Sequence, residues 1–264
     1  MSQLNKEKLQ TAITSFQQKI SENPEEYQKI FSERTDRVQY YQLYTAEKIQ
    51  QMTPDDFYKY IGKLWSMLLW GNKTYIVNKI LTENGIDNLK KSLISLLYGK
   101  EPIETRWQHA LSQTKRLGPA TISELLAYSN PEEYALFNKR TCDCLRYLGI
   151  SDTPTYTYQY TGKKYLEICQ ISKEIAKVME QNGLGSTNLL AVDYFLWDEI
   201  LPLVNTTQSE QPPLTTEIPG PKDNNPVSLH NEIRDKIVDI GQMLGFESDK
   251  EIKITTGAVV DAVW

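Results

Sequence analysis

The sequence predicts a mainly α-helical protein followed by a small α/β segment. Over the first 203 residues, apolar side chains recur every three or four positions, and Gly or Pro separates successive stretches. After residue 228 the pattern changes to one amphipathic stretch and two short apolar runs. We therefore expect a helical domain over 1–203, a disordered linker over 204–228 and an α/β segment over 229–264.

The helical domain is expected to begin with a helical stretch over 4–44, broken at 21–24. Thr53 then predicts a helix start as an N-cap, because Pro54 suits the first turn and Asp55 and Asp56 favour the positive end of the dipole. This helix is expected to end near residues 71–72. Further helices are expected over 75–84, 86–98, 103–115, 121–128, 138–148, 165–181 and 188–203.

Two stretches depart from this helical pattern. The segment 155–160 alternates Thr and Tyr, which predicts a short extended stretch. Its Tyr rings suggest base stacking, but the favoured interpretation is that they pack the loop onto the helical body. The segment 204–228 contains five prolines and almost no large apolar side chains, which is typical of a linker.

Composition indicates a soluble protein in a reduced, cytoplasmic setting. No apolar run is long enough to cross a membrane, the first ten residues are polar, and three cysteines do not form a secreted disulfide framework. The net charge is −5, yet residues 59–150 hold 13 Lys and Arg against 8 Asp and Glu. The middle of the chain is therefore the expected surface for an anionic partner.

A tight turn between two helices lies in this basic region. Gly118 is expected to supply an unusual backbone angle, and Pro119 the entry into the next helix. The turn then presents the free amides of a helix N-terminus beside two cations, an arrangement that binds a phosphate without reading base sequence. The expected DNA-binding residues are Lys115, Arg116, Gly118, Pro119, Ala120 and Thr121, joined by Lys139 and Arg140 further along.

The segment 115–126 resembles a helix-hairpin-helix element, and 134–150 resembles the segment that follows the hairpin in the helical DNA-glycosylase superfamily. The resemblance implies a glycosylase-like helical bundle. Glycosylases place a catalytic aspartate where this chain has Asn138, which supplies no negative charge. We therefore expect the DNA-binding scaffold without glycosylase chemistry.

A wider resemblance joins five short segments in order, 65–73, 97–99, 117–126, 130–134 and 193–197. They look like the N-terminal helical region of prokaryotic restriction-associated proteins. The resemblance implies double-stranded DNA as a partner, together with a co-encoded restriction or methylation subunit as a candidate partner. The aromatic residues in these segments are expected in the core, namely Trp65, Trp70, Phe195 and Trp197.

The pattern of the C-terminal segment predicts a helix over 230–245, a strand over 251–254, a turn and an apolar strand over 258–264. Asp261 interrupts the second strand, and a carboxylate there is costly to bury without a partner or a metal. This order resembles the start of a PD-(D/E)XK nuclease, a restriction-endonuclease-like fold. The resemblance implies that Asp261 is a catalytic Mg²⁺ ligand, with Glu232 as a further catalytic candidate.

The sequence given stops before the Glu-x-Lys of that family, so we expect no complete catalytic site and no bound Mg²⁺ in this chain. It is interpreted as a fragment of a longer protein or a natural truncation. The predicted function is DNA binding within a restriction endonuclease or defence protein. Two alternatives stay open: a base-excision DNA glycosylase, and a non-enzymatic scaffold that recruits a partner subunit.

Overall fold

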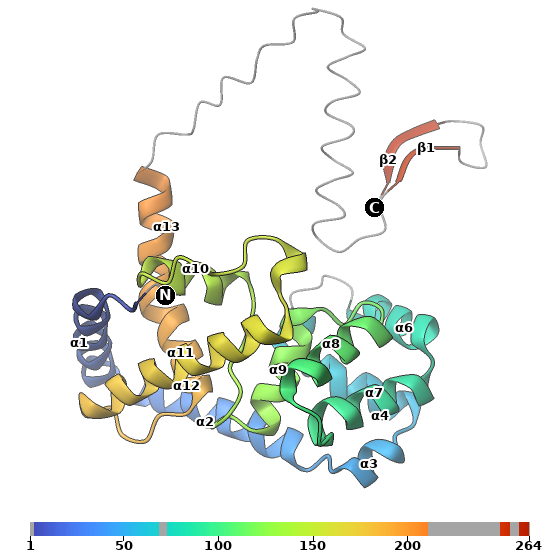
Figure 1. Ribbon diagram of the computed structural model, residues 1–264, viewed down its shortest axis with the longest axis horizontal. Coiled ribbons are helices and arrows are strands. Elements are labelled where there is room, and N and C mark those ends of the chain that lie inside the picture. The colour runs from blue at the N-terminus through green and yellow to red at the C-terminus, as the bar shows by residue number, and fades with distance from the viewer. Residues whose placement is uncertain (1–2, 69–72, 211–248, 254–258, 264) are drawn as a thin grey trace, which may run out of the picture. The chain divides into compact units, whose positions relative to one another are not determined.

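The computed structural model describes residues 3–68, 73–210, 249–253 and 259–263, and it divides the chain into two compact units (Figure 1). The described part of the first unit, Met1–Gln208, consists of helices and their connections, whereas the second, Ser209–Trp264, carries two strands. The prediction of a mainly α-helical protein is confirmed.

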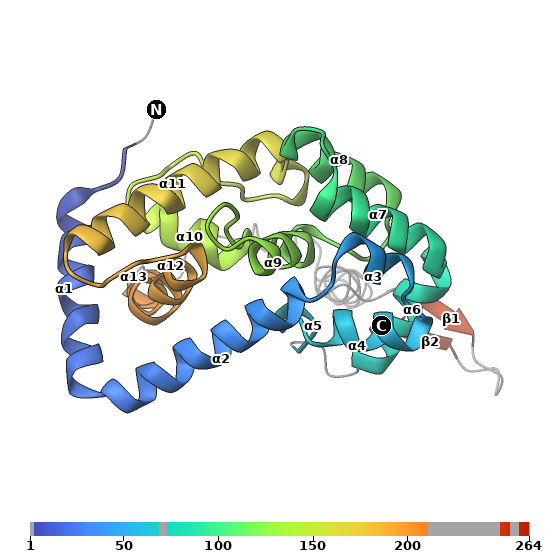
Figure 2. The same cartoon turned by 90° about the horizontal axis from the view of Figure 1, so that it is seen from below.

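The helices of the first unit follow the periodic apolar pattern closely. In chain order they are α1 (Lys6–Glu22), α2 (Pro24–Gln42), α3 (Ala46–Gln50), α4 (Pro54–Gly62), α5 (Trp65–Leu68), α6 (Lys73–Asn84), α7 (Ile86–Tyr98), α8 (Ile103–Gln113), α9 (Pro119–Ser129), α10 (Lys139–Tyr147), η1 (Thr157–Gln159), α11 (Gly162–Gln181), α12 (Leu189–Phe195), η2 (Leu196–Ile200) and α13 (Leu201–Glu210). Among these, α9 packs against α2, and α12 packs against α11 (Figure 2).

The start of α4 is confirmed, but its predicted end is wrong. Thr53 accepts the N–H of Asp56 at 3.2 Å, and Asp56 accepts the N–H of Thr53 at 3.0 Å, a reciprocal capping box. The helix ends at Gly62, well before residues 71–72. Glycine is a poor interior helix residue, and the turn that follows brings Leu64 fully into the core.

Two further expectations are corrected. The segment 155–160 contains the 3₁₀ turn η1 instead of an extended stretch, because the side chain of Gln159 accepts the N–H groups of Thr155 and Tyr156, each at 2.8 Å. Beyond α12, the π-helical turn η2 runs directly into α13, which extends to Glu210. The first residues of the expected linker are therefore helical. The five prolines of the expected linker begin at Pro212, after this helix.

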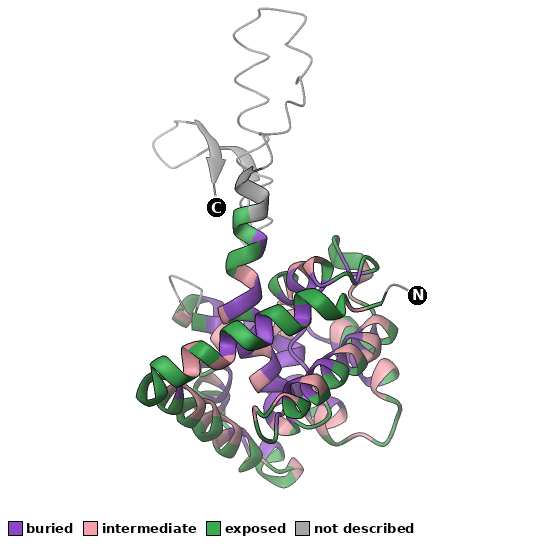
Figure 3. Cartoon of the chain, turned by 90° about the vertical axis from the view of Figure 1, so that its left-hand side faces the viewer, coloured by how far each residue is buried: buried purple, intermediate pink, exposed green. Residues whose placement is uncertain are grey.

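Aromatic rings fill the interior of the first unit, and most of its helices carry one buried and one exposed face (Figure 3). Trp107 stacks on Tyr165 with ring centroids 4.2 Å apart, and Tyr41 stacks on Tyr128 at 4.9 Å. Phe195 is fully buried, as predicted.

The other aromatic residues expected in the core have different outcomes. Trp197 lies in the π-helical turn η2 and is 49% exposed, so that prediction is wrong. Trp65 is half-buried, and Trp70 lies outside the described residues.

The second unit contains an antiparallel strand pair, β1 (Asp249–Lys253) and β2 (Val259–Val263), in which Ile252 faces Val260 in the register. Asp261 belongs to β2. The expected helix over 230–245, and with it Glu232, lies outside the described residues. Within the described residues, no helix has the length and apolar character needed to cross a bilayer.

Candidate nucleic-acid interface

The predicted hairpin consists of α8 and α9, joined by residues 114–118. The turn is held to the end of α6 by the side chain of Asn84. Its Oδ1 accepts the N–H of Lys115 at 2.7 Å, and its Nδ2 donates to the carbonyl of Lys115 at 3.1 Å. Two bonds from a single amide fix the path of the turn before α9 begins.

Gly118 does not supply the unusual backbone angle that the sequence led us to expect. Its φ is −82° and its ψ is 178°, an extended conformation open to any residue, and a Cβ placed there would contact nothing within 4 Å. The left-handed residue of the turn is Arg116, at φ 65°. Pro119 does occupy the first turn of α9, as predicted.

The two cations of the turn differ in their availability. Arg116 Nε lies 2.8 Å from Glu83 Oε1 on α6, and its side chain is largely buried. This ion pair neutralises much of the positive charge that the prediction assigned to phosphate binding. Lys115 is exposed. Arg116 is thus chiefly a structural residue of the turn, while Lys115 stays accessible to a ligand.

The N-terminus of α9 has backbone donors without partners in the described part of the chain. Gly118 is its N-cap and provides no side-chain oxygen, and no acceptor is found for the amides of Ala120 and Thr121. Ala120 is half-buried, whereas Thr121 is buried and its hydroxyl donates to Ser66 Oγ at 3.4 Å. The most accessible of these donors therefore lies at Ala120.

A second helix N-terminus, that of α10, carries the other predicted cations. Asn138 caps it by accepting the N–H of Thr141 at 3.0 Å. Lys139 is 82% exposed at its side chain and pairs with Asp143 one turn later, at 2.6 Å. Arg140 is exposed, and no ion pair with another described residue is found for it. Asn138 thus has a clear structural role in starting this helix.

The two helix starts line one pocket of about 460 Å³, which we call the hairpin pocket. Ala120 comes from α9, while Lys139 and Arg140 come from α10. Lys115, Arg116, Gly118 and Pro119 do not line it. The remaining lining residues are Arg34, Trp65, Ser66, Leu68, Glu124, Leu136, Asn138, Thr141, Cys144, Asp193, Leu196 and Trp197.

Charge is unevenly distributed in the hairpin pocket. Lys139 and Arg140 are exposed, whereas Glu124 is 2% exposed and caps α5 by accepting the amides of Trp65 and Ser66 at 2.6 and 3.0 Å. Burial raises the pKa of Glu124, and these two hydrogen bonds oppose the rise. Cations therefore occupy the exposed rim, and a carboxyl group lies in the buried part.

Arg34 of α2 and Asp193 of α12 form a second charged pair in the wall, at 3.5 Å. Burial raises the pKa of Asp193, and the Arg34 guanidinium counteracts this. The guanidinium carbon lies 4.3 Å from the ring centre of Trp65 and 4.8 Å from that of Tyr194. Cation–π contacts with both rings thus hold Arg34 in place.

Sequence reasoning missed Arg34, Glu124 and Asp193 as pocket residues. A signal was present for the two acids, because each interrupts an apolar helical stretch as Asp261 interrupts its strand. No local pattern marks Arg34, since α2 is polar along most of its length. Its partners come from distant parts of the chain, so its position depends on tertiary packing.

The tyrosines of the 155–160 segment only partly meet the prediction that they pack on the helical body. Tyr160 is half-buried, and its carbonyl accepts the indole N–H of Trp107 at 2.9 Å. Tyr156 and Tyr158 are instead 61% and 78% exposed, with parallel rings 5.8 Å apart. For these two residues the packing prediction is wrong, because the 3₁₀ turn directs both rings away from the helices.

The predicted metal site is not assembled within the described residues. Asp261 lies in β2 and Glu232 is not described, so nothing places the two relative to each other. No group of three His, Cys, Asp or Glu side chains suited to a metal ion occurs in the part of the chain that is described.

Comparisons with protein-family models, curated proteins and solved structures gave no match for this chain.

Proposed function

We propose that the helical unit binds double-stranded DNA through its phosphate backbone, as part of a restriction or defence protein. The observation that carries this proposal is that the N-termini of α9 and α10 line the same pocket, beside the exposed cations Lys139 and Arg140. Backbone N–H groups and side-chain cations can then contact the same anion from two sides.

The position of the acids limits where a phosphate binds. Glu124 and Asp193 lie in the wall of the hairpin pocket, and the largely buried Arg34 beside them is already paired with Asp193, so an anion deep inside would approach two carboxyl groups and one cation that has a partner. The exposed charged residues among those that line the pocket are Lys139, whose side chain pairs with Asp143 but is 82% exposed, and Arg140. We therefore place the phosphate at the rim, near the amide of Ala120, with Lys115 available for a neighbouring phosphate.

The nuclease part of the proposal concerns the second unit. We propose Asp261 as a Mg²⁺ ligand of a PD-(D/E)XK-like module, with Glu232 as a further acid. The support is the resemblance of the sequence and the location of Asp261 in a strand. A single carboxylate does not make a catalytic metal site, so no hydrolytic step is assigned to it.

DNA binding is tested by titrating a labelled duplex and following its fluorescence anisotropy. We expect affinity to fall steeply between about 50 mM and about 200 mM salt, because bound phosphates release counterions. Lys139→Glu with Arg140→Glu should weaken binding at least tenfold. The control Lys6→Glu with Lys177→Glu reverses two exposed cations on α1 and α11 and should have a much smaller effect. Affinity that is independent of salt, or equal losses in both double variants, would refute the proposal.

A base-excision glycosylase remains a second candidate because of one feature of the hairpin pocket. Its volume of about 460 Å³ is in the range of small-molecule sites, and the buried Glu124 supplies the carboxyl group that Asn138 lacks. Incubation with duplexes that contain damaged bases tests this candidate, since it requires abasic product from the wild type and none from Glu124→Gln.

A further inference from the structure

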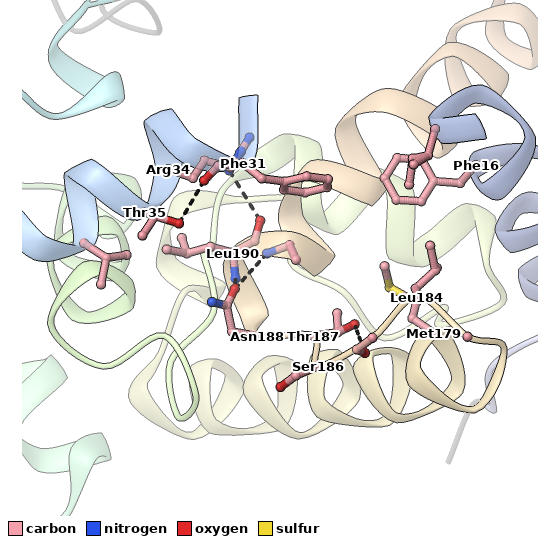
Figure 4. A pocket seen from close by; sticks show the side chains of 15 residues that line it. Phe16, Phe31, Arg34, Thr35, Met179, Leu184, Ser186, Thr187, Asn188 and Leu190 are labelled. Atoms are coloured by element: carbon pink, nitrogen blue, oxygen red, sulfur yellow. Dashed lines mark hydrogen bonds between the residues drawn. The ribbon is translucent and has the colours of Figure 1, made fainter. Parts of the chain in front are cut away.

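A second pocket, of about 630 Å³, lies between α1, α2 and the segment that leads from α11 into α12 (Figure 4). We call it the α2 pocket. Most of its wall is apolar, and this part comprises Phe16, Ile20, Phe31, Val38, Met179, Leu184, Leu190 and Ala191. Its size and apolar character fit a small organic ligand better than water alone.

Several polar groups of the α2 pocket already have partners. The hydroxyl of Thr35 donates to the carbonyl of Phe31 at 2.9 Å, and that of Thr187 donates to Gly185 at 3.1 Å. Asn188 Oδ1 accepts the amides of Leu190 and Ala191 at the start of α12 (Figure 4). These groups therefore already form hydrogen bonds within the protein.

Arg34 is the one charged residue among those that line the α2 pocket, and its guanidinium is poorly satisfied. Its side chain is 11% exposed, and its Nη1 donates to the carbonyl of Leu190 at 3.3 Å and to Asp193 at 3.5 Å, both long bonds. Among the described residues, Nε is buried without an acceptor. A guanidinium carries five N–H donors, and the Nε–H of Arg34 is one for which the described residues provide no acceptor.

We propose that the α2 pocket binds an organic anion with an apolar chain, such as a medium-chain carboxylate, whose charged end meets Arg34. The preference for an anion follows from Arg34, because its Nε–H has no acceptor among the described residues, its contact with Asp193 is a long one at 3.5 Å, and a carboxylate is a stronger acceptor for a guanidinium than a neutral group is. The apolar body follows from the phenyl and aliphatic side chains of the wall.

This inference does not depend on DNA binding. The α2 pocket and the hairpin pocket share Arg34, but the cations Lys139 and Arg140 that carry the DNA proposal line the hairpin pocket alone. A failure of either proposal therefore leaves the other standing.

Isothermal titration calorimetry of the full chain with three probes of equal chain length tests the inference. These probes are octanoate, octanol and octylammonium. We expect octanoate to bind at least tenfold more tightly than octanol, with octylammonium weakest, because among the three probes the carboxylate alone carries a charge opposite to that of the guanidinium. Equal affinity for octanoate and octanol, or no binding of octanoate, would overturn the proposal.

Two variants separate charge from shape. Arg34→Met keeps a long side chain between Trp65 and Tyr194 and should reduce octanoate affinity to that of octanol. Ala191→Trp should fill the α2 pocket and abolish binding of both probes, while leaving Arg34 present. If Arg34→Met fails to fold, the proposal is still tested by the affinities of the three probes for the wild type and for Ala191→Trp. Unchanged octanoate binding in Ala191→Trp would place the ligand elsewhere.

Discussion

The Oε1 atom of Glu124 accepts the backbone N–H of Trp65 at 2.6 Å, across 59 residues of sequence. Its Oε2 accepts the next amide, that of Ser66, at 3.0 Å. A buried carboxyl group on α9 thereby caps the short helix α5, and both elements contribute to the hairpin pocket. This connection determines where the half-buried ring of Trp65 lies.

Glu124→Gln should destabilise the protein at every pH, because an amide oxygen replaces just one of the two acceptors and its NH₂ group faces the other backbone N–H. We expect a loss of about 1–3 kcal/mol in the free energy of unfolding. Urea unfolding of the wild type and the variant measures it. Glu124→Ala, which removes both acceptors, should cost more, and equal stability of all three proteins would exclude the capping role.

The pH dependence of stability should also change in Glu124→Gln. Burial raises the pKa of Glu124 in the folded state above its ordinary value of 4.5. Between these two pKa values the folded state holds a proton that the unfolded state has lost, so this group makes stability fall as pH rises. The difference in unfolding free energy between wild type and variant, measured from about pH 4 to about pH 8, should therefore be largest at the acid end. A difference that grows toward alkaline pH would contradict the assignment.

Gly118→Ala should change the free energy of unfolding by less than about 1 kcal/mol, because the residue is extended with open space around its Cα, and alanine's restriction of the unfolded chain offsets its poorer N-cap propensity. Gly149→Ala is the matched comparison. That glycine has φ 98°, and an added Cβ would lie 3.0 Å from the carbonyl oxygen of Gln3, so we expect a loss of more than about 1 kcal/mol. The denaturation midpoints of both variants and the wild type measure these changes in stability. A large loss of stability in Gly118→Ala would show that the turn needs glycine.

Asn138→Ala should cost about 1 kcal/mol, since it removes the cap of α10, while Asn138→Asp should retain the cap. The aspartate variant also adds a negative charge to the hairpin pocket, beside Lys139 and Arg140. It should therefore lower DNA affinity without lowering stability. Thermal unfolding and anisotropy titration of both variants measure these separate effects, and unchanged DNA binding in Asn138→Asp would argue against a phosphate at this rim.

Arg116→Gln should weaken DNA binding less than Arg140→Gln, although the two changes remove the same charge. The guanidinium of Arg116 is engaged by Glu83 at 2.8 Å, whereas Arg140 is exposed at the hairpin pocket. The slope of log affinity against log salt should shrink by about 0.9 for each phosphate that the protein no longer neutralises, and this is expected for Arg140→Gln. The reverse order of effects would move the interface from α10 to the turn.

The periodic apolar pattern was sufficient to predict the helical class and most helix positions, because each helix of this domain buries one face. The N-cap of α4 was also predicted from the sequence, and the reciprocal hydrogen bonds of Thr53 and Asp56 confirm it. The predictions failed where a distant residue decides the conformation. Asn84 and Glu83 of α6 hold the turn, and Arg116 instead of Gly118 adopts the left-handed angle.

The candidate site shows the same division. Sequence alone determined that cations and helix starts occur at residues 115–121 and 138–141, since charge and capping are local properties. Tertiary structure decided that Ala120 and Arg140 share a pocket while Arg116 does not, and that Arg34 and Glu124 belong to its wall. The physical reason is that contacts between residues far apart in the chain depend on how α2, α9, α10 and α12 pack, which no local pattern encodes.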